Sequence, residues 1–193
     1  MLYTEFNRKN YGGSDVQSML KVFEEHVASV KEDRPDISIQ FERCTDESPL
    51  LVSIVTPLMK GIHEHVSESG ELIFIDSSSN MDEYHLRVFL VVTQSVIRAL
   101  PLGLLITSDE KTETLIQGFT LLKHCFDENS FYSMGSDGPE MGMTDNCTEL
   151  RDALEKVFPN MKLLLCTFHI LQQVWRWLME SMHGISGEVH ENV

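Results

Sequence analysis

Long apolar runs, glycine and proline are all scarce in this sequence of 193 residues. No stretch reaches the roughly 18 consecutive apolar residues of a membrane-spanning helix. The first residues contain no basic segment followed by an apolar run, so no secretory signal is visible. With 11 glycines and 6 prolines, the chain is not a low-complexity polymer. We therefore expect a soluble, intracellular protein with one main domain, since a content of 42% hydrophobic residues can build a substantial core.

Cysteine is also infrequent. The four cysteines are widely spaced, and none belongs to a Cys-x-x-Cys pair: Cys44, Cys125, Cys147 and Cys166. This spacing argues against a disulfide framework and against a complete zinc ribbon. We expect all four thiols to be reduced.

Basic residues are outnumbered by acidic ones. The chain has 15 Lys and Arg residues against 30 Asp and Glu residues, for a net charge of −15. Contacts to phosphate groups normally require a basic surface, so this balance is unfavourable for binding nucleic acid. Any role on DNA would need basic modules from elsewhere.

The hydrophobic periodicity predicts an α/β fold in two parts. Residues 1–66 are expected to form an N-terminal helix–strand–helix extension, and residues 184–193 a polar tail. Residues 67–183 show the order βββαβαβα, which is that of ribonuclease-H-like nucleases. The expected helices are 15–30, 50–66, one from Asp109, 147–158 and 168–182, and the expected strands are 36–43, 72–76, 84–93, 100–107, 141–144 and 161–166.

Two aspartates stand at the ends of two of these strands. Asp76 ends the apolar run that starts at Leu72, and Asp145 directly follows the strand 141–144. Both carboxylates could converge at one edge of a single sheet. An Asp in this position is by itself more often a turn or cap residue, but two at matching points of the fold predict a site for a divalent metal.

The stretch from Leu72 to Leu178 resembles the catalytic domain of Mutator-like-element (MULE) transposases, and it covers more than half of the chain. Each motif is weak alone, but their order and spacing together are specific. The motifs are the strand ending in Asp76, Pro101-Leu102-Gly103, the Asp109-Glu110 helix start, Thr144-Asp145, Leu150-x-x-Ala153, Val157-Phe158-Pro159 and Cys166-x-x-His169.

The resemblance implies a DDE-type enzyme that depends on Mg²⁺ or Mn²⁺, cuts DNA at transposon ends and joins them to a target. Asp76 and Asp145 match the first and second catalytic aspartates, which act as metal ligands, and Cys166 and His169 match a motif near the active site. In such enzymes, carboxylates hold two metal ions about 3.5–4 Å apart. The resemblance also implies DNA as partner, a nuclear or cytoplasmic location, and assembly into a homo-oligomer as an open possibility.

The third catalytic carboxylate of the family is not evident. In the family, a glutamate follows a helical insertion, so we expect the domain over 67–183 to be incomplete on its C-terminal side. Glu180 is an alternative, but it lies roughly eleven residues beyond His169 on the same helix, on the order of 16 Å away. We therefore do not expect Glu180 to be the third ligand.

Two other functions compete with an active transposase domain. The chain could be an inactive remnant or a domesticated module that keeps the fold for protein contacts, which the missing glutamate and the acidic charge favour. An unrelated ribonuclease-H-like nuclease would need an acid at the start of the last helix, where this chain has Phe168-His169-Ile170.

Several other residues have structural interpretations. Cys166 taken alone is expected to be a small buried residue, and His169 a histidine in the first helical turn with a satisfied hydrogen bond. The cluster His63-Glu64-His65 is expected on the solvated surface, because neighbours two apart on a helix point in different directions. Trp175 is expected to pack in the core.

Overall fold

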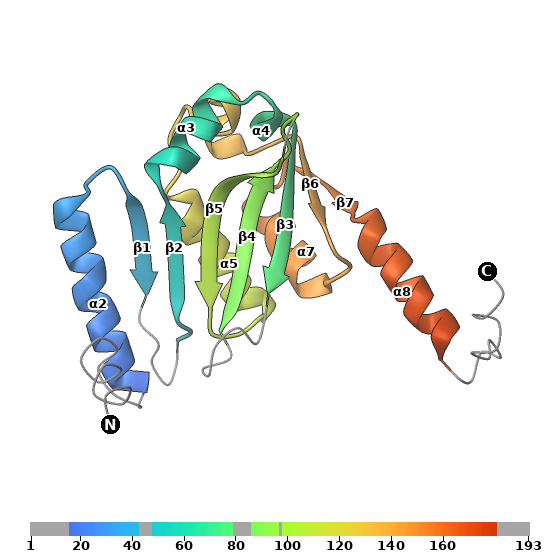
Figure 1. Cartoon of the computed structure of the whole chain (residues 1–193), viewed down its shortest axis with the longest axis horizontal. Coiled ribbons are helices and arrows are strands. Elements are labelled where there is room, and N and C mark those ends of the chain that lie inside the picture. Colours follow the sequence, from blue (N-terminus) through green and yellow to red (C-terminus); the bar gives the residue numbers. More distant parts are fainter. Residues whose placement is uncertain (1–15, 43–47, 79–85, 97, 181–193) are drawn as a thin grey trace.

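The structure is a computed structural model that describes residues 16–42, 48–78, 86–96 and 98–180. It contains a seven-stranded mixed sheet with the strand order β1-β2-β5-β4-β3-β6-β7. Helices α5 and α7 lie behind one face of the sheet, and α3 and α4 lie at one end of the strands (Figure 1). Cys44 and the tail 184–193 fall outside the described residues.

The N-terminal part supplies two strands of this sheet. Helix α2 (Val16–Asp33) leads into β1 (Ser38–Glu42), which pairs antiparallel with β2 (Leu51–Val55). Strand β2 then pairs antiparallel with β5 (Leu100–Thr107). Two helices follow β2, namely α3 (Pro57–His65) and the single turn α4 (Glu68–Glu71).

The remaining strands form the expected core. Strands β3 (Leu72–Ser78), β4 (Arg87–Thr93) and β5 make an antiparallel meander, while β6 (Met141–Thr144) and β7 (Lys162–Leu165) add parallel to β3. The helices between them are α5 (Thr112–Lys123), α6 (Ser130–Ser133), the 3₁₀ turn η1 (Gly135–Asp137) and α7 (Thr148–Val157), and α8 (Thr167–Met179) follows β7. This mixed α/β architecture is compatible with a ribonuclease-H-like core, so the predicted fold class is confirmed.

The helix predicted over 50–66 is wrong in its first half. Residues Leu51–Val55 form strand β2, and the helix begins only at Pro57. Leu51, Val52 and Val55 are all buried, because β2 is covered on both faces. A run that is apolar on both faces has no clear period, so helical spacing can be fitted to it by chance.

The main core lies between the sheet and helices α5 and α7. Alternate residues of the central strands point into it, including Ile73, Ile75, Phe89 and Val91, all of which are nearly inaccessible to solvent. Helix α5 approaches the sheet closely at Gly118, where a Cβ atom would lie 2.9 Å from Leu105 Cδ1. The absence of a side chain at Gly118 therefore sets the spacing between this helix and β5.

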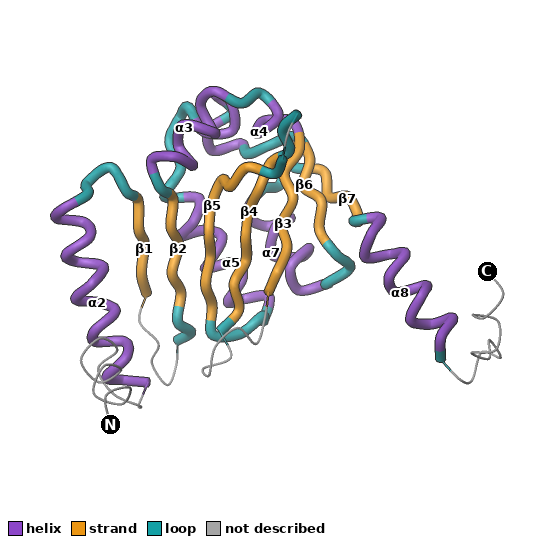
Figure 2. The backbone as a smooth tube through the Cα atoms, viewed as in Figure 1, coloured by secondary structure: helices purple, strands orange, loops and turns teal. Residues whose placement is uncertain are grey.

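The opposite face of the sheet is covered at its β1 end. Leu20 of α2 is fully buried in a second cluster with Ile39 and Val52. The rings of Phe23 and Phe41 also meet, with centroids 5.4 Å apart. Figure 2 shows this helix at one edge of the sheet and α8 leaving from the other edge. Within the described residues, no helix packs on this face over β4, β3 and β6.

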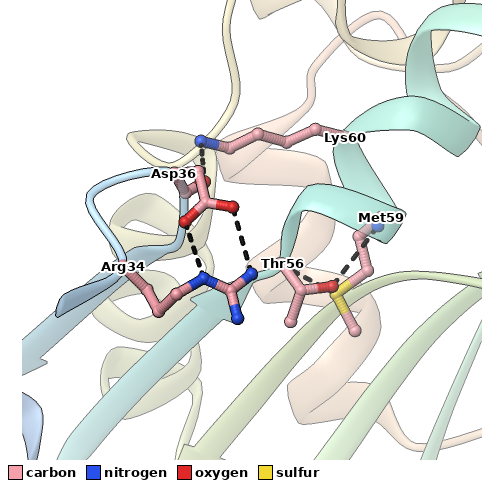
Figure 3. Close-up of polar contacts among 5 residues, drawn as sticks. All are labelled: Arg34, Asp36, Thr56, Met59 and Lys60. Carbon is pink, nitrogen blue, oxygen red and sulfur yellow. Dashed lines mark hydrogen bonds and ion pairs between the residues drawn. The ribbon is translucent and has the colours of Figure 1, made fainter. Parts of the chain in front are cut away.

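Polar contacts connect the loop after α2 to helix α3 (Figure 3). Arg34 donates from Nε and Nη2 to the two carboxylate oxygens of Asp36, both at 3.1 Å, and this lowers the pKa of Asp36. Lys60 Nζ donates to the backbone oxygen of Asp36 at 2.9 Å. Thr56 caps α3 by accepting from the Met59 N–H at 3.4 Å. These contacts position the α2–β1 turn beside the start of α3.

Candidate functional site

Asp76 and Asp145 lie on neighbouring parallel strands. Strand β3 pairs with β6 so that Phe74 is opposite Met143. Each aspartate is two residues beyond that pair, Asp76 still within β3 and Asp145 directly after β6. Because paired parallel strands are about 4.8 Å apart, the two residues reach the same edge of the sheet side by side.

Cys166 and His169 come to the same edge from β7. The Cys166 N–H donates to Thr144 O at 2.7 Å, which extends the pairing of β7 with β6 by one residue. Cys166 then occupies the N-cap position of α8, and His169 lies in the first turn of that helix. The two residues therefore leave the sheet next to Asp145.

The four residues line one cavity of about 370 Å³. Its lining includes Asp76, Asp145, Cys166 and His169. The structure thus brings together every residue that the sequence singled out for a site. Asp76 is exposed and Asp145 is half-buried, so both carboxylates are accessible to solvent-borne ligands.

Local hydrogen bonds fix the backbone around Asp145. Its Oδ1 accepts from the Cys147 N–H at 3.1 Å, and Thr144 Oγ1 donates to the backbone oxygen of Asp145 at 2.8 Å. Arg151 Nη1 lies 3.4 Å from both Thr144 Oγ1 and Leu164 O. These contacts hold the end of β6, the end of β7 and the start of α7 together, and they orient the Asp145 carboxylate.

Two groups close to the aspartates have unusual environments. His169 Nδ1 is shielded from solvent and has no hydrogen-bond partner within the described part of the chain, contrary to the satisfied bond expected for it. A buried polar atom of this kind normally has a ligand or an ordered water as its partner. Burial also raises the pKa of the Cys147 thiol, whose Sγ donates to Glu149 Oε2 at 3.4 Å.

The carboxylate oxygens of Asp76 and Asp145 are chemically suited to bind a hard divalent cation. Carboxylate oxygens are the ligands that Mg²⁺ prefers, and one or two of them commonly suffice because Mg²⁺ keeps several waters. Among the described residues, however, no group of three or more His, Cys, Asp or Glu side chains is placed to hold a metal ion. Glu180 follows the last turn of α8, at the opposite end of that helix from His169.

The walls of the cavity were not predicted from the sequence. They include Phe74, Val92 and Met143 from the sheet, with Gln94 and Ala99 from the residues between β4 and β5. The period of two along β3 could have placed Phe74 on the face of Asp76. Nothing in the local sequence indicates that the β4–β5 connection borders the same cavity.

Two structural interpretations of the sequence are wrong. His63 is 1% exposed rather than solvated, since Nε2 lies 3.0 Å from Leu102 O and Nδ1 accepts from the Phe131 N–H at 3.1 Å. Trp175 is 55% exposed rather than in the core, because α8 extends away from the sheet. Glu64 and His65 are exposed as expected.

Comparison with known families assigns the part of the chain that contains this site. The family model described as the MULE transposase domain matches residues 72–173, which run from the start of β3 into α8. Comparison with curated proteins finds no match. None of the helices in the described ranges is long and apolar enough to cross a membrane. The match covers more than half of the sequence and all four predicted site residues, and the chain therefore belongs to the MULE transposase domain family.

Proposed function

We propose that this chain is the catalytic part of a transposase that cleaves DNA at transposon ends and transfers the strands, with Asp76 and Asp145 as ligands of Mg²⁺ or Mn²⁺. Membership of the family supports a transposase-type function, interaction with DNA and a dependence on divalent metal in general terms. The observation that carries the finer proposal is that Asp76 within β3 and Asp145 directly after the adjacent parallel strand β6 line one cavity.

Each residue of the site has a distinct part in this proposal. Asp76 is held by β3, which is paired on both sides within the sheet, and Asp145 is oriented by the Cys147 N–H. A bound divalent cation would supply charge stabilisation for the attacking and leaving oxygens of a phosphodiester. Cys166 and His169 border the cavity, where His169 Nδ1 can accept or donate one hydrogen bond to a bound group.

The acidic charge limits how this chain would meet DNA. With a net charge of −15, long-range attraction to phosphate cannot come from the chain as a whole. We propose that basic modules on other polypeptide segments or subunits supply it, in a nuclear protein. The division of the chain into 1–66, 67–183 and 184–193 is likewise a proposal.

Binding of Mn²⁺ tests the proposed ligands. In titrations followed by electron paramagnetic resonance, Asp76→Asn and Asp145→Asn should each weaken Mn²⁺ binding at least about tenfold, since removal of one carboxylate leaves a single one. Asp137→Asn, at the exposed turn η1 before β6, is the matched control and should bind as the parent chain does. Unchanged affinity in both site variants would overturn the metal site.

A second function remains open because the described residues hold no set of three acids around the cavity. In this second function, the chain is an inactive member of the family that keeps the fold for protein contacts. The two functions separate in a cleavage assay on DNA carrying transposon ends, run with Mn²⁺. Bound Mn²⁺ without cleavage, in the presence of the basic modules, would support the inactive module.

A further inference from the structure

The cavity beside the two aspartates extends well beyond them. Along β3, Ile73 and Ile75 are buried in the main core, so Phe74 and Asp76 belong to the opposite face of the sheet. Phe74 precedes Asp76 by two residues, about 6.6 Å along the strand, and both line the cavity of about 370 Å³. The cavity therefore runs from the carboxylates back along this face towards the start of β3.

Apolar side chains form the middle of the cavity. Phe74 lies opposite Val92 of β4 on one side and opposite Met143 of β6 on the other. Figure 1 shows these three strands side by side. All three side chains are half-buried, and Ala99 lines the same cavity. This part of the cavity suits a flat apolar group, because a charged group placed there would lose its hydration without gaining a partner.

A polar residue ends the cavity on the side away from the aspartates. Gln94 follows the last residue of β4, is exposed, and lines the cavity. Because β4 runs antiparallel to β3, Gln94 lies beyond Phe74 as seen from Asp76, roughly 13 Å from Asp76 along the strands. Its amide offers both hydrogen-bond donors and an acceptor. A carboxylate end, an apolar middle and an amide end therefore follow one another along the cavity.

Charge restricts what can occupy such a cavity. An anionic group would be repelled by Asp76 and Asp145 unless a cation lay between them. In the proposed function, that group is a phosphodiester of DNA held through Mg²⁺ or Mn²⁺. The neighbouring part of a DNA strand is a sugar that carries a neutral base. A base has a flat surface that stacks on apolar and aromatic side chains and an edge that forms hydrogen bonds, which correspond to the apolar middle and to the Gln94 amide.

We propose that the cavity holds one unstacked nucleobase of the DNA strand whose phosphodiester lies at Asp76 and Asp145. Phe74 and Met143 contact the flat surface of the base, and Gln94 binds its edge. This inference rests on the proposed function, since the phosphate has to be held at the aspartates. Taking a base out of its stack costs free energy, and the cost is lowest for a base that is already unpaired. The chain should therefore prefer DNA with an unpaired base beside the bound phosphodiester.

Two probes that differ in the base test this inference. 2′-Deoxyadenosine 5′-monophosphate and 2-deoxyribose 5-phosphate share the sugar phosphate, but only the nucleotide can fill the apolar middle of the cavity. Isothermal titration calorimetry of the whole chain, saturated with Mg²⁺, should give a dissociation constant at least about fivefold lower for the nucleotide. Equal dissociation constants, or no binding of either probe, would overturn the base site.

Substitutions along the cavity should change the ratio of the two dissociation constants. Phe74→Ala removes stacking surface and should bring the ratio close to one, while Gln94→Ala should weaken binding of the nucleotide alone about two- to tenfold. Gln94 is exposed, so its variant still tests the site if Phe74→Ala impairs folding. The matched control is Leu90→Ala, because Leu90 is 42% exposed on the same face but outside the cavity lining. It should keep the parent ratio. A parent ratio in both cavity variants would contradict the inference.

Asp76→Asn separates the base site from the metal site. If the phosphate is anchored through the metal, this substitution should weaken binding of both probes by the same factor and leave their ratio unchanged. Mn²⁺ binding that depends on Asp76, together with equal affinities for the two probes, would overturn the base site and leave the metal site standing. A chain that binds no Mn²⁺ would overturn both, because the base would then have no anchored phosphate beside it.

Discussion

One amphipathic helix lies at each end of the sheet, and within the described residues only α2 of these two helices has a buried side chain. At the β1 end, α2 places Leu20 fully inside a cluster with Ile39 and Val52. At the β7 end, α8 has no buried residue although Phe168 and Leu171 are as apolar as anything in α2. The helix that is richer in apolar residues, α8, is therefore the one that buries none of them.

The connections to the sheet also differ between the two ends. Residues 34–37 separate α2 from β1 and turn the chain back along the sheet, with Arg34 paired to Asp36 in that turn. Only Cys166 separates β7 from α8, and its backbone is bound on both sides. The length of the connection does not decide packing alone, because α3 follows β2 after the single residue Thr56 and still buries Ile62 and His63.

The comparison is tested most strongly by matched leucine substitutions. Leu20→Ala should lower the free energy of unfolding by about 2–5 kcal/mol, because it leaves a cavity in a packed cluster. Leu171→Ala should change it by less than about 0.5 kcal/mol, since an exposed side chain loses little. Urea denaturation measures both changes, and equal effects would refute the difference between the ends.

Protonation of His63 should weaken the packed region next to α3. Burial lowers the pKa of His63 to about 4 from its ordinary 6.5. Between these values the unfolded chain binds a proton that the folded chain does not, so stability falls as the pH decreases from 6.5 to 4, by about 3 kcal/mol in all. Urea denaturation at a series of pH values measures this loss.

A histidine control belongs with that experiment. His63→Gln should remove the pH dependence in this window, whereas His65→Gln should retain it, because His65 is exposed. A parent chain and a His63→Gln variant with the same pH profile would contradict the assignment.

Two helical glycines should respond in opposite directions. Gly118→Ala would place a Cβ atom 2.9 Å from the buried Leu105 side chain, so we expect a net loss of about 1 kcal/mol after the gain in helix propensity. Gly61→Ala meets nothing within 4 Å and should stabilise α3 by about 0.5–1 kcal/mol. Thermal unfolding compares them, and stabilisation in both would mean that α5 can move away from the sheet.

The smallest effect is expected in the α2–β1 turn. Arg34→Ala removes the ion pair with Asp36, in which both side chains are exposed. Such pairs contribute little and are screened by salt, so the melting temperature should fall slightly at low ionic strength and not at all in high salt. A large loss that persists in high salt would show that the turn itself controls the docking of α2.

The secondary structure of segments with a clear hydrophobic period was predicted correctly from the sequence. The strand before Asp76, the strand before Asp145 and the helix after Cys166 all lie where the pattern placed them. The segment 50–66 was not, because the apolar run of β2 is buried on both faces and has no distinguishing period. The burial of His63 was also not predicted, because the backbone groups that bind its ring belong to Leu102 and Phe131, which are distant in the sequence.

The sequence by itself determined the α/β class, the order of the core elements and the four residues of the candidate site, because these follow from local periodicity and from motifs along the chain. The tertiary structure alone decided that β1 and β2 extend the sheet through β5, that Phe74 and Met143 border the cavity, and that α8 stands away from the sheet. These features depend on strand pairing and on the direction of one backbone junction, which no local pattern of side chains encodes.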